Sequence, residues 1–539
     1  MMENKRTKTF FEEMDRISEL PEPILNHVLS FLSFKEVVQS SVLSKRWEKV
    51  WLTCPVLEFD EKVFNKYLDW YEYRKLNKHV QRRRNALFNC LTGIMRNYRD
   101  NVISIKKFTM SLFLSDDRAF TSFVNHCIYY AIGCNVSEIK LLFRFVCGET
   151  YKYNLPQIVL FAKSLEVLEL QGCNVGLPTS DHLKLSSLRK LCLSNVRVDD
   201  RMIENLVGGC PLIEYLNFNL CEGFKCLELF GLTRLYEIKL FKNYEIEWLD
   251  IKALNVRSLE ITRTNVSHEI DLSFCKNLTR LMLCYAPITD EWLCDLILQL
   301  PVLKFLSISC CYKLKTIEIS SCCLEELDLC EYIDCNWIEL KIDTPNLRSL
   351  SYRGTVLVLS LNASALSKIN LHFLSRNVET QKYIKFLANF HHFSQVLDLE
   401  IVKSENVMVP RELRQTLSSP LSSVKLLNLR FRTRQNCYSI AKIVDGLLWF
   451  APHIKTILIK NGSVNEYSFK FTYKKQPTYE GETASCCKSL PIKCWNHCME
   501  AVNVEFNEVS NIIRYSLSGA RIWEKIVALC KVWELINSD

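Results

Sequence analysis

One apolar pattern recurs through the middle of this 539-residue chain and constrains its fold more than any other feature. Three apolar residues spaced as L-x-x-L-x-L, with conservative replacements, return first at steps near 30 residues and then at steps of 19 to 25. The occurrences are Ile105/Phe108/Met110, Val136/Ile139/Leu141, Leu165/Leu168/Leu170, Leu188/Leu191/Leu193, Ile213/Leu216/Phe218, Leu235/Ile238/Leu240, Val256/Leu259/Ile261, Leu278/Leu281/Leu283, Leu303/Leu306/Ile308, Leu324/Leu327/Leu329, Leu347/Leu350/Tyr352 and Leu366/Ile369/Leu371. Repeats of this length bury an apolar face only against their neighbours. The pattern therefore predicts an α/β fold, a curved parallel sheet in a repeat solenoid, over residues 101–460.

A second regularity supports a leucine-rich repeat. Eight residues after the first apolar position of four repeats stand Cys173, Cys221, Asn243 and Cys311. Leucine-rich repeats carry Asn or Cys at this position. We expect these side chains to turn inward and to hydrogen-bond the backbone of adjacent coils, which explains much of the cysteine count without metal or disulfide.

The segments between the predicted strands are of two kinds. Residues 199–207 and 289–299 are amphipathic and predict helices. Elsewhere a second strand-like half-repeat follows the first, at Phe224/Leu227/Leu229, Ile246/Leu249/Ile251 and Leu314/Ile317/Ile319. Those coils should have a strand in place of a helix on the convex side.

Residues 15–60 have the pattern of three short helices, after a mobile tail at residues 1–14. The apolar residues from Ile24 to Leu32 share one helical face, and Pro21 and Pro23 stand at its entry, where a missing N–H costs nothing. Ser33 to Glu36 has the spacing of a capping box for a second helix, and a third begins near Ser44. Three short helices cannot close a core in so few residues, so we expect a partner to cover part of their apolar surface.

This module resembles the F-box of plant F-box/leucine-rich-repeat proteins. The resemblance rests on Leu20-Pro21, Ile24-Leu25, Leu29-Ser30-Phe31-Leu32 and the run from Ser41 to Trp47, with Trp51. It implies a substrate receptor of an SCF-type ubiquitin ligase, whose F-box binds a Skp1-type adaptor and through it cullin and RING subunits. The implied Skp1 contacts are Leu20, Pro21, Ile24, Leu25, Val28, Leu29 and Trp47. Periodicity alone leaves the alternative that these helices only cover the neighbouring domain.

Three further segments complete the organisation. Residues 61–100 predict a helical joint; its basic run Arg82 to Arg84 beside aromatic residues suggests RNA binding as an alternative to a solvated helix face. Residues 461–490 predict a loop. Residues 491–539 are similar to the α+β FBD domain that ends many such plant proteins, with a strand around Ala501 to Phe506, a helix over residues 509–517 and another element over 522–529.

Composition excludes several classes of protein. A net charge of +8 over so long a chain is too dilute to indicate nucleic acid. The 25 cysteines lie among aliphatic residues and indicate reduced thiols in a reducing compartment. No apolar run suits a signal peptide or a membrane span, so we expect a cytoplasmic or nuclear protein that binds no membrane.

No motif for catalysis or a cofactor is recognisable. Cys486, Cys487, Cys494, His497 and Cys498 invite a zinc site, but their spacing matches no familiar finger and chance clustering is the simpler explanation. No phosphate-binding glycine loop, nucleophile elbow or metalloprotease motif occurs. We therefore expect no metal, no cofactor and no catalytic activity.

The remaining prediction concerns the target protein. Residues that flank the inner leucines should face the concave surface, and their mixed charges and aromatic rings suit a protein ligand. The candidates for target contact are Tyr215, Phe241, Arg280, Phe305 and Arg353. Two alternatives stay open: the contact lies on loops or the carboxy-terminal domain, or the chain is a scaffold or inhibitor that binds Skp1 without ubiquitylating anything. The identity of the target and the need for a small co-ligand are not encoded in any motif.

Overall fold

The computed structural model describes residues 17–536 apart from a series of gaps. The gaps are 18, 33, 51–52, 62–81, 83–85, 87, 90, 97–104, 115–117, 146–151, 177–182, 184, 265–269, 333–334, 336, 375–378, 392–395, 418, 422, 432–438, 462–464, 475–496, 509–510 and 520. The chain divides into two compact units, Met1–Ala253 and Leu254–Asp539, named here unit 1 and unit 2.

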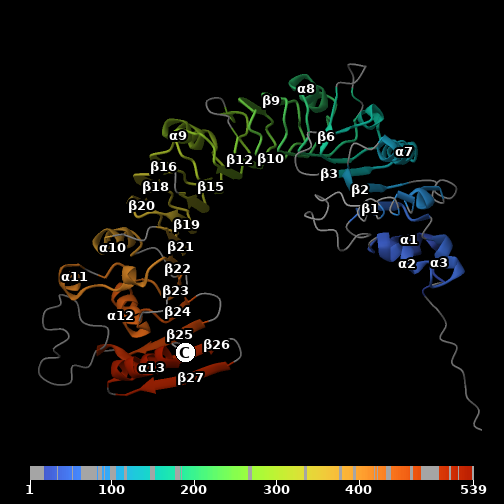
Figure 1. Ribbon diagram of the computed structural model, residues 1–539. Helices are drawn as coiled ribbons and strands as arrows, with labels where there is room; N and C mark the ends of the chain where they lie inside the picture. The colour runs from blue at the N-terminus through green and yellow to red at the C-terminus, as the bar shows by residue number, and fades with distance from the viewer. Residues whose placement is uncertain are drawn as a thin grey trace, which may run out of the picture. The chain divides into compact units, whose positions relative to one another are not determined.

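Unit 1 begins with the three predicted helices, α1 (Glu22–Leu29), α2 (Phe34–Ser40) and α3 (Lys45–Val50) (Figure 1). Pro21 occupies the N-cap position of α1 and Pro23 lies in its first turn, at the helix entry where the sequence predicted both. The hydroxyl of Ser44 caps α3 by accepting a hydrogen bond from the N–H of Trp47 at 3.3 Å. The predicted capping residue Ser33 lies outside the described residues.

A parallel sheet forms the rest of unit 1. In spatial order its strands are β1 (Val56–Asp60), β2 (Lys107–Leu114), β3 (Glu138–Phe145), β5 (Val167–Gln171), β7 (Lys190–Ser194), β8 (Tyr215–Asn219) and β10 (Glu237–Phe241). The repeat leucines pair in register, so that Leu168, Leu191, Leu216 and Ile238 form one buried row across four strands. This confirms the predicted parallel sheet, because period-two residues from consecutive repeats share one face.

The first strand of this sheet lies at the end of the predicted F-box range, residues 15–60. Residues 56–60 follow the three helices, form β1 and pair in parallel with β2. Leu57 and Phe59 are fully buried, and the ring of Phe59 lies 6.2 Å from that of Phe108. Buried and partly exposed side chains alternate along residues 56–60, and this short pattern forms a strand because the edge of β2 is available for pairing.

A second layer covers the other side of each coil. It contains α7 (Arg118–Gly133), β4 (Tyr153–Asn154), η2 (Gln157–Phe161), β6 (Cys173–Asn174), α8 (Asp200–Gly208), β9 (Cys226–Phe230) and β11 (Trp248–Lys252). The helix predicted over residues 199–207 is α8, and the predicted half-repeats are β9 and β11, which pair in parallel. Asp199 caps α8 by accepting from the N–H of Met202 at 2.8 Å.

The turns after β5, β7, β8 and β10 have a repeated conformation. Gly172, Asn195, Leu220 and Lys242 all have positive φ, between 50° and 72°. The N–H of Asn195 donates to the carbonyl of Asn219 in the next coil, and that of Leu220 donates to Phe241. Because this left-handed residue reverses the chain direction, the residue after it points into the coil.

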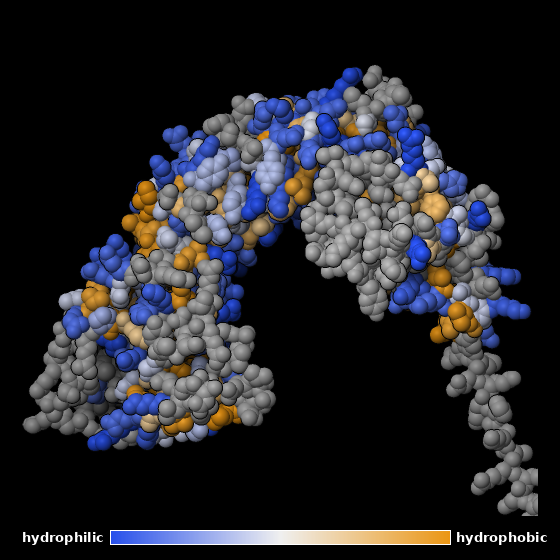
Figure 2. Space-filling view, in the orientation of Figure 1, coloured by the Kyte–Doolittle hydropathy of each residue, from blue (hydrophilic) through white to orange (hydrophobic). Residues whose placement is uncertain are grey.

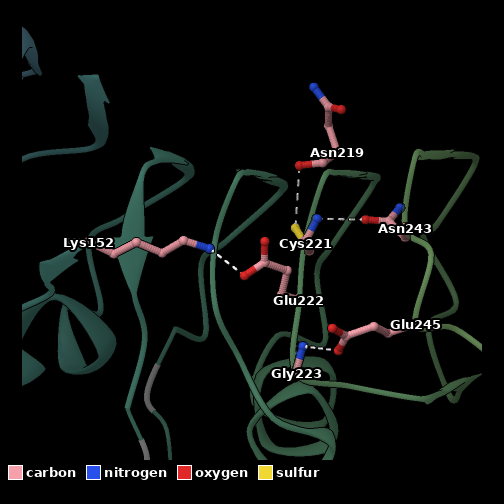
Figure 3. Close-up of polar contacts among 7 residues, drawn as sticks. All are labelled: Lys152, Asn219, Cys221, Glu222, Gly223, Asn243 and Glu245. Atoms are coloured by element: carbon pink, nitrogen blue, oxygen red, sulfur yellow. Dashed lines mark hydrogen bonds and ion pairs between the residues drawn. The ribbon is translucent and has the colours of Figure 1, made fainter. Parts of the chain in front are cut away.

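The inward residues form the hydrogen-bonded ladder that the sequence predicted (Figure 3). Asn243 accepts from the N–H of Cys221 at 2.9 Å and donates to the carbonyl of Phe218 at 2.8 Å. The thiol of Cys221 lies 3.4 Å from the carbonyl of Leu193, one coil back. Cys173 departs from the prediction in part, because the hydrogen bond of its thiol goes to Gln171 within its own coil.

The sheet strands of unit 2 are also parallel up to β24 (Thr456–Asn461). In spatial order they are β12 (Ser258–Thr262), β14 (Arg280–Cys284), β15 (Phe305–Ser309), β17 (Glu326–Cys330), β19 (Ser349–Gly354), β21 (Lys368–Phe373), β22 (Val396–Ile401), β23 (Leu426–Phe431) and β24. In unit 2 Cys311 corresponds to Cys221, because its thiol lies 3.8 Å from the carbonyl of Leu283 in the preceding coil.

The other layer of unit 2 mixes strands and helices. It consists of β13 (Ile270–Asp271), α9 (Asp290–Gln299), β16 (Thr316–Ser320), β18 (Glu339–Asp343), β20 (Val358–Asn362), α10 (Thr380–Ala388), η3 (Ser404–Val407), α11 (Arg411–Thr416) and α12 (Ile440–Phe450). The helix predicted over 289–299 is α9, and the half-repeat at Leu314/Ile317/Ile319 is β16, which pairs in parallel with β18.

The carboxy-terminal part of unit 2 is antiparallel and corrects two predictions. β25 (Asn465–Tyr473), β26 (Met499–Glu508) and β27 (Asn511–Ser518) continue the sheet from β24, and α13 (Ile522–Ile536) packs against β26 and β27. Residues 465–473 were predicted as loop but form β25, whose Tyr467, Phe469 and Phe471 are buried. Residues 509–517 were predicted as helix, but 511–518 form a strand because β26 supplies an antiparallel partner.

Several predictions fall on residues that the structure does not describe. Most of the predicted joint at 61–100 is among them, although residues 91–96 are helical. Arg83, Arg84, Cys486, Cys487 and Cys494 also lie outside the described residues. Within the described part of the chain, no helix has both the length and the apolar character needed to cross a membrane.

Candidate functional site

The interior of the three-helix module contains three of the predicted adaptor contacts. Leu25 and Leu29 are completely buried, and Trp47 is 5% exposed. Val37 and Val50 are buried with them. These side chains therefore pack inside the module and stabilise it. An amphipathic helix shows its apolar residues in sequence, but the neighbouring helices decide which of them are covered.

The outer face of the module exposes the other predicted contacts together with residues that the prediction missed. Pro21, Ile24 and Val28 are exposed, and Leu20 is half-buried. The same module exposes further apolar side chains: Ile17, Phe31, Leu32, Val42 and Leu43. Apolar surface gathers on this module in Figure 2. We name the residues Ile17, Leu20, Pro21, Ile24, Val28, Phe31, Leu32, Val42 and Leu43 the docking face.

Local contacts hold the docking face in place. Arg46 of α3 donates a hydrogen bond to the carbonyl of Leu20, which ties the entry of α1 to the third helix. The ring of Phe31 lies edge-on to His27 at 4.9 Å, yet Phe31 remains 76% exposed. Val42 is 88% exposed in the turn between α2 and α3. A monomer rarely leaves so many large apolar side chains together in water, so this face has the character of an interaction surface.

The exposed sheet face of unit 1 contains two predicted target contacts, Tyr215 and Phe241. Lys190 and Lys239 place their ammonium groups 5.1 Å and 5.8 Å from the centre of the Tyr215 ring. Lys242 lies 5.0 Å from the Phe241 ring. Half-buried aromatic rings held by cations are rigid and partly desolvated, which suits contact with a protein.

Charges alternate along the same face. Lys140 pairs with Glu138 at 3.1 Å and with Glu169 at 3.5 Å, and Lys239 pairs with Glu237 at 3.0 Å. Acidic and basic side chains thus pair within a strand, as in Lys239–Glu237, and between strands, as in Lys140–Glu169. This arrangement is unlike the continuous basic surface that binds a nucleic-acid backbone.

The exposed sheet face of unit 2 contains the other three predicted target contacts, Arg280, Phe305 and Arg353. The structure brings Arg280 and Phe305 together, since they are register partners on β14 and β15 and the guanidinium lies 4.0 Å from the ring centre. Arg353 is exposed on β19, several strands away. Arg263 and Tyr285, which the prediction missed, make a similar stack at 4.4 Å. Their signal in the sequence was weak because both stand after a strand, in the left-handed turn.

The described residues show no arrangement of three or more His, Cys, Asp or Glu side chains suited to a metal ion. Burial raises the pKa of the Cys221 and Cys311 thiols to about 12, which keeps both protonated at neutral pH. Thiols in this state are hydrogen-bonding and packing groups, not nucleophiles.

Comparison with known families matches both parts of this architecture. Residues 17–59 match the F-box domain, and residues 94–270 and 255–459 match the At1g61320/AtMIF1 LRR domain, which together cover more than half of the chain. The first match contains the docking face, and the second contains both exposed sheet faces.

Curated relatives come from Arabidopsis thaliana. The F-box/LRR-repeat protein At3g03360 is 25% identical over 375 residues, 67% of this chain and 71% of that protein. The putative F-box/LRR-repeat protein At5g02930 is 28% identical over 44% of each chain. The putative F-box/FBD/LRR-repeat protein At5g22670 is 29% identical over 39% of this chain and 42% of its own length. The alignments thus span less than half of the last two relatives. On its two domain matches and this architecture, the chain belongs to the plant F-box/LRR-repeat proteins.

Proposed function

We propose that this protein is the substrate-recognition subunit of an SCF-type ubiquitin ligase, which binds a Skp1-type adaptor through the docking face and a target protein through its repeats. The observation that supports this most directly is the exposed apolar surface on the F-box helices. Burying such side chains against a partner contributes about 25 cal/mol per Å² of apolar area. The buried Leu25, Leu29 and Trp47 act by holding that surface in shape.

The proposed role needs no reacting group from this chain. The repeats hold the target, and the adaptor connects the F-box to a cullin and a RING subunit. This arrangement keeps the target near a ubiquitin-conjugating enzyme that carries ubiquitin as a thioester. Effective concentration, not acid–base chemistry, then accelerates ubiquitin transfer. The protein is a non-catalytic subunit in this proposal, and it acts in the cytoplasm or the nucleus.

Co-purification with a plant Skp1-type adaptor tests the docking face. The double variants Leu20→Ala with Pro21→Ala, and Phe31→Ala with Val42→Ala, should each reduce adaptor recovery at least tenfold. Leu298→Ala is the matched control, because Leu298 is 75% exposed on α9, outside the F-box. Wild-type recovery of both double variants would contradict the proposal, provided that circular dichroism shows that they are folded.

Reconstitution with cullin, RING and a ubiquitin-conjugating enzyme separates the two readings of this architecture. A ligase receptor should support ubiquitylation of a protein that co-purifies with the repeats, and the docking-face variants should lose it. Adaptor binding without any transfer would favour the scaffold or inhibitor instead.

Target contact is proposed for the exposed sheet faces of each unit. Tyr215 and Phe241 in unit 1, and Arg280, Phe305 and Arg353 in unit 2, are the side chains to substitute first. Arg280→Ala and Phe305→Ala should weaken recovery of the target to a similar degree, because each removes half of one stack. Leu298→Ala serves again as control, and unchanged recovery by every variant would move the contact to the loops or the carboxy-terminal region.

The carboxy-terminal region is proposed to be an FBD-like domain. In its support, strands β25 to β27 and α13 form an α+β arrangement, and the name of one relative includes FBD. Trp533 of α13 is buried against Tyr467 and Phe506, at ring distances of 5.6 Å and 5.4 Å. Deletion of residues 522–539 should therefore expose the carboxy-terminal face of the sheet while leaving adaptor binding unchanged.

A further inference from the structure

Three cysteine thiols from neighbouring strands of unit 2 meet on the exposed sheet face. Cys284 ends β14, Cys330 ends β17, and Cys310 directly follows β15, the strand between them. Cys310 neighbours both other thiols and contributes to raising the pKa of each. One sulfur therefore stands between two possible partners.

The backbone determines where the Cys310 thiol points. Cys310 has φ of 56°, the left-handed conformation of the repeated turn, and its N–H donates to the carbonyl of Cys330 at 2.7 Å. The next residue, Cys311, points into the coil, where its thiol reaches the carbonyl of Ser309 at 3.5 Å. Two adjacent cysteines thus have different surroundings, because the Cys311 thiol is turned into the coil and hydrogen-bonds backbone carbonyls there.

The spacing of the backbone suits a disulfide. Cys284 and Cys330 are each the register partner of Ser309, so Cys310 is one residue along from both. With strands about 4.8 Å apart and a rise of about 3.3 Å per residue, the expected Cα separation is about 6 Å. Disulfides span Cα separations of about 4.4 to 6.8 Å. All three cysteines are free; Cys310 is buried, and Cys284 and Cys330 beside it are partly exposed, which gives the reagent access to the cluster.

Neighbouring groups set the reactivity of the cluster. The guanidinium of Arg263 favours the thiolate of Cys284, whereas burial acts more strongly in the opposite direction. The net result raises the pKa of both Cys284 and Cys330 to about 11. Since the thiolate is the reactive form, oxidation of these thiols should be slow at neutral pH and faster as the pH rises toward 11.

We propose that Cys310 is an oxidative modification site, which forms a disulfide with Cys284 or Cys330 in the presence of hydrogen peroxide. A thiolate attacks the peroxide, so that an S–O bond forms, the O–O bond breaks and hydroxide leaves. The second thiolate attacks the resulting sulfenic acid, so that an S–S bond forms and the S–O bond breaks. In total two thiols lose two electrons and two protons, and one peroxide becomes two waters. The site is independent of adaptor binding.

Peptide mapping of the full chain tests this proposal. The protein is treated with hydrogen peroxide, blocked with N-ethylmaleimide, digested without reduction and analysed by mass spectrometry. Peptides that link Cys310 to Cys284 or Cys330 should appear, and their rate of formation should rise about tenfold per pH unit between pH 7 and 9. Cys310→Ser should remove both linked peptides, whereas Cys311→Ser, the adjacent control, should retain them.

Two further measurements keep the test decisive. Cys284→Ser should leave only the link to Cys330, and Cys330→Ser only the link to Cys284, whether or not Cys310→Ser folds. The sulfurs of Cys322 and Cys323 are 3.8 Å apart, with Cys322 exposed and Cys323 partly exposed, so their oxidation reports that the reagent was active. Recovery of Cys284, Cys310 and Cys330 as alkylated thiols while that pair is oxidised would overturn the proposal.

Discussion

Asn243 holds Cys221 across two neighbouring coils of unit 1. The side-chain amide of Asn243 accepts the Cys221 N–H at 2.9 Å (Figure 3). The same amide donates to the Phe218 carbonyl at 2.8 Å, and Asn243 is completely buried. A single side chain thus satisfies two backbone groups that the turn removes from the sheet. This pairing links consecutive repeats by hydrogen bonds in addition to apolar contact.

Asn243→Leu should destabilise the repeats around β8 and β10 by about 2 to 4 kcal/mol. The substitution keeps the volume but leaves a buried N–H and a buried carbonyl without partners, at about 1 to 2 kcal/mol each. Hydrogen exchange followed by mass spectrometry should show faster exchange of the Cys221 amide. Asn277→Leu, at an exposed position of unit 2, is the control and should change little. Unaltered exchange at Cys221 in the Asn243 variant would contradict this role.

Asp290→Ala should destabilise the junction between α9 and β16 by about 1 to 2 kcal/mol. The carboxylate accepts from the N–H groups of Lys315 at 2.9 Å and Thr316 at 3.1 Å, and it lies in the first turn of α9, where negative charge is favourable. Urea unfolding followed by circular dichroism measures the loss. Asp295→Ala is the matched control on the exposed side of the same helix. Equal effects of the two variants would contradict the specific role of Asp290.

Asp200 in unit 1 accepts hydrogen bonds from the N–H groups of Lys225 and Cys226 in the same manner.

Leu220→Gly should stabilise unit 1 by about 0.5 to 1 kcal/mol. Leu220 has φ of 53°, a left-handed conformation that strains a residue with a Cβ. Its side chain is 40% exposed, so burial of apolar area offsets little of this strain. Relief of about 1 to 2 kcal/mol is partly offset by the greater freedom of glycine in the unfolded chain. Leu220→Ala keeps the Cβ and should bring no gain. A thermal unfolding midpoint raised equally by both variants would show that the side chain, not φ, was responsible.

Stability should fall as the pH rises above 9. Burial raises the pKa of Cys210, Cys221 and Cys311 to about 12 in the folded protein, whereas an unfolded thiol ionises near pH 9. Between pH 9 and 12 only the unfolded chain releases these protons. The contribution of the three thiols to the free energy of unfolding is therefore fully present below pH 9 and is lost between pH 9 and 12. Urea midpoints at stepped pH measure this, and Cys210→Ala should make the decline shallower. A midpoint that stays constant up to pH 11 would contradict it.

Strands and helices whose apolar residues recur at a fixed spacing along the chain were predictable from the sequence. The spacing of Leu168, Leu191 and Leu216 gave the strand positions, because alternation and repeat length are visible without knowledge of neighbours. The inward positions of Cys221 and Asn243 followed for the same reason. The two amphipathic segments became α8 and α9, since a helical stripe is also a local pattern.

Elements that depend on a partner were missed. The β1 strand at Val56–Asp60 forms because β2 offers an edge, and the β27 strand at Asn511–Ser518 forms because β26 does. The same limit explains the adaptor contacts. Leu25 and Val28 lie on one apolar stripe, yet the packing of α1 against α3 buries the first and leaves the second exposed.

The amino-acid sequence by itself determined the repeat, the F-box motif and the family, because each is a pattern of residue types along the chain. Only the tertiary structure decided which apolar side chains remain open to a partner, and which thiols among so many come together at Cys310. Exposure and proximity arise from packing between distant segments, and this packing depends on the whole coil and not on any one repeat.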